Sequence, residues 1–95
     1  TSALKIALQE EIDKHIDNIK VRKIFKCAIR RIDVTTLYFK SLHSDDLENF
    51  TSDLAEAFER KIIAYDELNI ITFDAYNTCY DIITSAERTA RKYMW

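Results

Sequence analysis

Residues 68–74 read Leu-Asn-Ile-Ile-Thr-Phe-Asp and contain a helix stop followed closely by a helix start. Asn69 is the residue type that best replaces glycine in the left-handed conformation that often ends a helix. Thr72 suits an N-cap, because its hydroxyl can accept a hydrogen bond from a free backbone N–H, and Asp74 then lies in the positively polarised first turn. The segment therefore predicts two antiparallel helices joined by a very short connection.

The composition of the whole chain indicates helices throughout. The 95 residues include no glycine and no proline, the residues that tight hairpin turns and many loops require. A hydrophobic content of 47% with 32% charged residues is typical of a folded domain rather than a disordered chain. The length suits one domain with one modest core. We therefore expect a single all-α domain over residues 1–95, a compact antiparallel four-helix bundle.

Apolar residues recur at three- and four-residue intervals and define the expected helices. We place a break near residues 18–22, because the apolar stripes before and after it would lie on opposite faces of one straight helix. The alternative is three helices, with the first two fused into one long helix. Asp45 and Glu48 have the spacing of a capping box at the start of the third helix. The expected helices span residues 3–19, 21–42, 45–68 and 72–94.

The residues that carry known chemistry are sparse. Phosphate-binding loops and nucleophile elbows need glycine, which the chain lacks. Glu11 and His15 are four residues apart and are interpreted as a solvated helix-surface pair rather than as metal ligands. We therefore expect a protein that is not an enzyme and that uses no cofactor or metal.

The cysteines and the hydropathy favour the cytoplasm. Two cysteines, Cys27 and Cys79, are interpreted as buried thiols in a reducing compartment, since a small secreted domain usually carries a denser disulfide framework. No apolar run approaches the roughly 18 residues needed to cross a bilayer, so no membrane partner is expected.

A basic row on the expected second helix offers one possible binding surface. Its members project to one side of that helix: Arg22, Lys23, Lys26 and Arg30. Such a row could meet the phosphates of a nucleic acid. The net charge of −2, the acidic third helix and the absence of a recognition motif weigh against this function, which is kept as the alternative.

Apolar residues outside the main stripes predict a protein interface. Val34 and Leu37 lie beside the basic row, where a single core would leave them exposed, and Ile82 widens the apolar arc of the fourth helix. Tyr93 and Trp95 form an aromatic tail suited to docking. Other apolar residues are expected to face the core, among them Tyr65, Leu68 and Phe73.

These patterns predict a small non-enzymatic helical protein that acts by binding another protein or a second copy of itself, such as a homodimer. A regulator, an inhibitor, an immunity factor and an assembly subunit all fit this description. Glu87 interrupts the apolar stripe of the fourth helix, so its carboxylate is expected to reach solvent or to find a partner.

Overall fold

The computed structural model describes residues 2–34 and 47–92, and this part of the chain contains four α-helices. They are α1 (Ser2–His15), α2 (Ile19–Arg30), α4 (Leu47–Tyr65) and α5 (Ala75–Lys92). No strand occurs among the described residues. The predicted all-α four-helix bundle is therefore confirmed.

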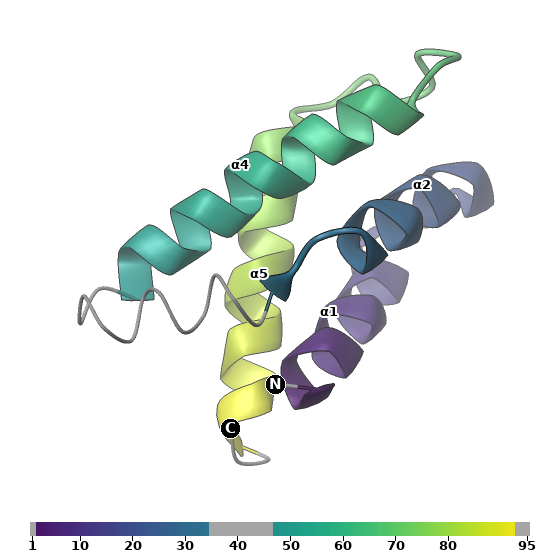
Figure 1. Cartoon of the computed structure of the whole chain (residues 1–95). Helices are drawn as coiled ribbons and strands as arrows, with labels where there is room; N and C mark the ends of the chain where they lie inside the picture. The colour runs from purple at the N-terminus through teal and green to yellow at the C-terminus, as the bar shows by residue number, and fades with distance from the viewer. Residues whose placement is uncertain (1, 35–46, 93–95) are drawn as a thin grey trace.

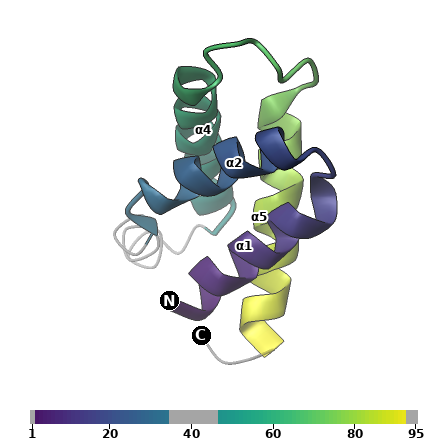
Figure 2. The ribbon, with the colours of Figure 1, turned by 90° about the vertical axis from the view of Figure 1, so that its right-hand side faces the viewer.

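The helices form two pairs that pack across one another. Figure 1 shows α1 and α2 on one side of the molecule and α4 and α5 on the other. In Figure 2, α1 and α2 pass in front of α4 and α5. α5 packs against both α1 and α4, while α2 packs against α4 and α1. The connection between α4 and α5 lies at the top of Figure 2.

One hydrophobic cluster joins all four helices. Phe25 on α2 and Phe58 on α4 meet edge to face, with ring centroids 5.5 Å apart, and both side chains are fully buried. Other members of the cluster include Leu4, Leu8, Ile12, Ile29, Phe50, Leu54, Ile62, Ile82 and Ile83. Both helix pairs therefore depend on a shared core.

Asn18 separates α1 from α2. Its side-chain oxygen accepts the backbone N–H groups of Lys20 at 2.9 Å and Val21 at 3.3 Å, as an N-cap does. The break covers residues 16–18 and so begins slightly before the predicted range of 18–22. The three-helix alternative is wrong.

α2 ends much earlier than predicted. The helix stops at Arg30 rather than at residue 42, and the backbone N–H groups of Arg31 and Ile32 bond three residues back, which tightens the last turn. The chain then brings Val34 into the core, where only 1% of its surface is exposed. The expectation that Val34 is exposed was wrong, because it assumed that the helix continued. Leu37 lies outside the described residues. So do Asp45 and the side chain of Glu48, so the predicted capping box stays a prediction.

The connection between α4 and α5 confirms part of its prediction. Asn69 has a positive φ of 52°, the left-handed conformation expected for it. The very short connection that was predicted is wrong, because α4 ends at Tyr65 rather than at residue 68 and α5 begins at Ala75 rather than at residue 72, which leaves a connection of 66–74. Asp74, rather than Thr72, occupies the capping position of α5, since its carboxylate accepts the backbone N–H of Asn77 at 3.2 Å.

Candidate interaction surface

The residues predicted for a protein interface divide into two groups. Ile82 is fully buried, and Val34 nearly so, within the chain's own core. Neither presents a surface to a partner, because α1 and α4 pack against α5 around Ile82, and Val34 belongs to the same core cluster. Leu37, Tyr93 and Trp95 lie outside the described residues, so their role stays a prediction.

Large apolar side chains are instead exposed at one end of the molecule. Leu68 is 79% exposed, Ile19 66%, Ile63 65% and Phe73 44%. Together with the exposed Tyr65 they flank the α1–α2 connection, 16–18, and the α4–α5 connection, 66–74. We call this surface the loop end, comprising Ile19, Ile63, Tyr65, Leu68 and Phe73.

The sequence pattern predicts that Tyr65, Leu68 and Phe73 face the core, and this prediction is wrong. α4 stops at Tyr65, so Leu68 leaves the helical face that would have turned it inward. Phe73 precedes α5 rather than lying on it, although its ring still lies 6.2 Å from that of Phe25. Asp66 and Asp74, which end α4 and begin α5, are the sequence signal that could have shortened both helices.

Phe73 joins two hollows of the loop end. The first, of about 340 Å³, lies between the end of α4 and residues 69–75, and its walls include Ile63 and Phe73. The second, of about 260 Å³, is lined by Phe73 together with residues 15–18 and Val21. The α1–α2 connection and the α4–α5 connection therefore meet at Phe73.

The first hollow is acidic. Glu59, Asp66 and Asp74 line it, and no Lys or Arg of the described residues does so. We call it the acidic hollow. A neighbouring hollow of about 300 Å³ is also lined by Asp66. Its other lining residues include Lys20, Lys23, Glu67 and Leu68. Charges of opposite sign thus lie around the exposed apolar side chains.

Hydrogen bonds brace the backbone of the loop end. The Asp66 carboxylate accepts the N–H groups of Ile70 at 2.8 Å and Ile71 at 2.9 Å. The Asp74 carboxylate accepts from the backbone and the side-chain amide of Asn77, at 3.2 and 2.7 Å. Exposed apolar side chains are therefore held on an ordered framework.

Asp13 on α1 engages half of the predicted basic row. Its Oδ1 atom lies 2.8 Å from Lys26 Nζ and 3.6 Å from Arg22 Nε. Arg22 Nε also donates to the Ile16 carbonyl at 3.0 Å. Lys23 and Arg30 remain exposed and form no ion pair within the described residues. The row is therefore less positive than the sequence suggests.

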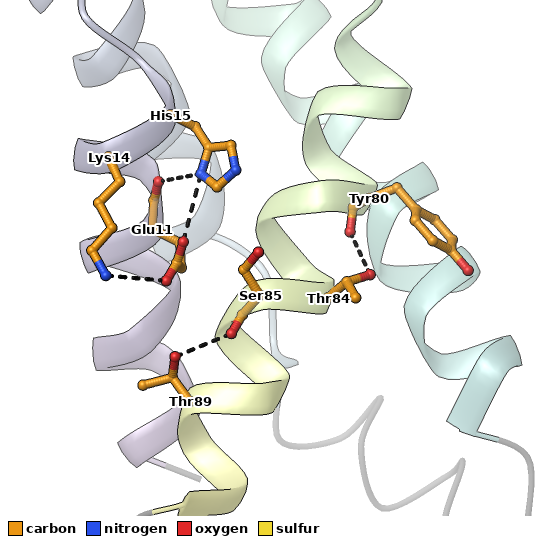
Figure 3. Close-up of polar contacts among 7 residues, drawn as sticks. All are labelled: Glu11, Lys14, His15, Tyr80, Thr84, Ser85 and Thr89. Atoms are coloured by element: carbon orange, nitrogen blue, oxygen red, sulfur yellow. Dashed lines mark hydrogen bonds and ion pairs between the residues drawn. The ribbon is translucent and has the colours of Figure 1, made fainter.

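Glu11 is buried rather than solvated, which corrects the expected surface pair. Figure 3 shows Glu11 between Lys14 and His15 on α1, beside α5. Its carboxylate lies 3.5 Å from Lys14 Nζ and 3.6 Å from His15 Nδ1, and only 7% of the residue is exposed. On α5, the Thr84 and Thr89 hydroxyls donate to the Tyr80 and Ser85 carbonyls. Each of these contacts lies within a single helix, and no metal-binding cluster includes them in the described part of the chain.

Glu87 has the partner that its buried position requires. The Thr51 hydroxyl of α4 donates to Glu87 Oε2 of α5 at 3.3 Å, and both residues are buried. The contact therefore links two helices through the core.

The two cysteines differ, and the expectation that both are buried was wrong for one. Cys79 is buried, whereas Cys27 is exposed on α2. Burial, with a smaller contribution from the Glu59 carboxylate, raises the pKa of the Cys79 thiol far above its usual value of 9.0.

Neither a metal-binding cluster nor a membrane span is present in the described ranges. No three His, Cys, Asp or Glu side chains gather there to hold an ion. Of the helices described, none combines the length and apolar character that crossing a bilayer demands.

The fold and its exposed end define a small all-α protein with a candidate interaction surface. Comparison with models of protein families, with curated protein sequences and with solved structures found no match.

Proposed function

We propose that this chain is a small, non-enzymatic helical protein that acts by binding another protein through its loop end. The observation that carries the proposal is the exposure of Leu68, Ile63 and Ile19 on a braced framework. Grouped exposed apolar side chains of this size mark interaction sites more often than isolated ones do.

The energetics of the loop end favour binding. Full burial of one Leu, Ile or Phe side chain contributes about 1.5–3 kcal/mol. The Asp66 and Asp74 hydrogen bonds fix the backbone in advance, so little conformational entropy remains to be lost on association. A partner that covers the three most exposed of these side chains, Leu68, Ile19 and Ile63, would therefore gain most of the available hydrophobic free energy.

A regulator, an inhibitor, an immunity factor or an assembly subunit would each use such a surface. Leu37, Tyr93 and Trp95 remain candidates for extending it. The exposed free thiol of Cys27 is compatible with a reducing compartment, which supports a cytoplasmic role.

Site-specific photo-crosslinking tests the proposal. A photoreactive residue replaces Leu68 in one variant and the exposed Asp81 of α5 in a matched control, and both are irradiated in an extract of the cells that make the protein. We expect a discrete protein adduct from position 68 that weakens when Ile63→Asp is added, and none from position 81. Equal adducts at both positions, or none at either, would contradict the proposal.

Nucleic-acid binding is the second candidate function. Lys23 and Arg30 are exposed on α2, next to Lys20 and Arg31, which are also exposed. Binding through this row would weaken steeply as salt rises and would be reduced by Lys23→Glu with Arg30→Glu. Fluorescence anisotropy with a labelled oligonucleotide at about 50 mM salt tests it, and an unchanged signal would remove this candidate.

A further inference from the structure

The acidic hollow combines apolar walls with unpaired negative charge. Ile63 and Phe73 form part of its walls. Glu59 is half-buried at its edge, and within the described residues it forms no ion pair. Asp66 and Asp74 add charge while their oxygens hold backbone N–H groups. The chemistry that fits is an apolar side chain flanked by cations.

The start of α2 carries that chemistry. Ile19 is among the most exposed apolar side chains of the molecule. Lys20 follows it, and Lys23 lies one helical turn further on, on the same face. Both lysines are exposed, and neither forms an ion pair in the described part of the chain. We call Ile19, Lys20 and Lys23 the basic corner.

We propose that the partner is a second copy of this chain, whose basic corner docks in the acidic hollow. This inference rests on the proposed function and names the occupant of part of its surface. Ile19 of one copy is buried against Ile63 and Phe73 of the other, and Lys20 and Lys23 approach Glu59. Burial supplies most of the free energy, while the charges set orientation and partner choice.

The corner and the hollow are neighbouring parts of the loop end, so the contact can form once, head to tail, or twice about a two-fold axis. In either arrangement the corner of one copy meets the hollow of the other, so the two surfaces can be disabled separately. This difference between the surfaces provides a complementation test. A variant that lacks only a working corner can still offer its hollow to a variant that lacks only a working hollow.

The experiment uses sedimentation of the full chain at rising concentration and at about 50 mM salt. The corner variant is Lys20→Glu with Lys23→Glu, and the hollow variants are Glu59→Lys with Asp74→Asn and, separately, Ile63→Asp. Asn is as good an N-cap as Asp, so the start of α5 is retained. Arg30→Glu with Arg31→Glu reverses the same charge at the other end of α2 and serves as the control.

We expect wild type and control to associate with similar affinity. Each corner or hollow variant alone should associate at least about tenfold more weakly. Circular dichroism should show the same helix content in all of them. Mixing the corner variant with either hollow variant should restore a 1:1 dimer and nothing larger. A wild type that stays monomeric to about 1 mM, or a mixture that does not combine, would overturn the second-copy inference. If position 68 still crosslinks to a different protein, the proposed function stands without it.

Discussion

Asp66 accepts the backbone N–H of Ile71 at 2.9 Å across the connection that carries the loop end. Its second oxygen accepts the N–H of Ile70 at 2.8 Å, so one carboxylate fixes the path of the chain after α4. Hydrogen bonds to a charged group each contribute about 1.5–3 kcal/mol. The geometry of the exposed apolar side chains therefore depends on this residue.

We predict that Asp66→Ala lowers the free energy of unfolding by about 3 kcal/mol or more, because two backbone donors lose a charged acceptor. Urea denaturation measures the change. The exposed Asp81 provides a control, and Asp81→Ala should stay within about 0.5 kcal/mol of wild type. An Asp66→Ala variant as stable as that control would show that the carboxylate does not brace the connection.

Thr51→Val should destabilise the bundle by about 1–3 kcal/mol, because the buried Glu87 carboxylate loses a donor from α4. Thr84→Val is the matched control, since among the described residues the Thr84 hydroxyl donates within its own helix, to the Tyr80 carbonyl. Combining Thr51→Val with Glu87→Gln should give less than the sum of the two single changes in unfolding free energy. Strict additivity would mean that the two side chains do not interact.

The thiols should differ in reactivity toward a disulfide reagent at pH 8. Cys27 is exposed and should react promptly, while Cys79 should react only after unfolding, because burial raises its pKa. Above pH 9 the unfolded chain releases the Cys79 proton and the folded chain keeps it. The unfolding free energy should therefore fall with pH, by up to about 1.4 kcal/mol per unit, more steeply in wild type than in Cys79→Ala. Equal slopes would contradict the assignment.

Asp13→Asn should cost no more than about 1 kcal/mol of stability, because its pairs with Lys26 and Arg22 are partly exposed. The difference from wild type should shrink in about 0.5 M salt, which screens such pairs. Thermal unfolding at both salt concentrations checks this, and a loss that is unaffected by salt would indicate that Asp13 acts through packing instead.

The sequence predicts the fold well because its strongest signal is the spacing of apolar residues. That spacing, with the absence of glycine and proline, requires helices, and the left-handed Asn69 follows from the same absence. Helix ends were predicted less well. Asn18, Asp66 and Asp74 each compete for backbone N–H groups, and which of several polar residues caps a helix depends on local geometry.

The candidate surface could not be predicted because it depends on those ends. α4 ends a few residues earlier than predicted and α5 begins a few residues later, so Leu68 and Phe73 lie at the surface rather than in the core. α2 also ends earlier than predicted, and Val34 is therefore buried in the core rather than exposed. Periodicity identifies which residues are apolar but not where the chain leaves the helix that would bury them.

Side-chain footprinting with hydroxyl radicals tests the loop end most directly, by comparing the dilute purified protein with the same protein in an extract of its own cells. The exposed Ile6 lies on α1, away from the loop end, and serves as the internal reference. We predict that oxidation of Tyr65, Leu68 and Phe73 falls severalfold in the extract relative to Ile6. Equal oxidation of the loop end under both conditions would contradict its role as the binding surface.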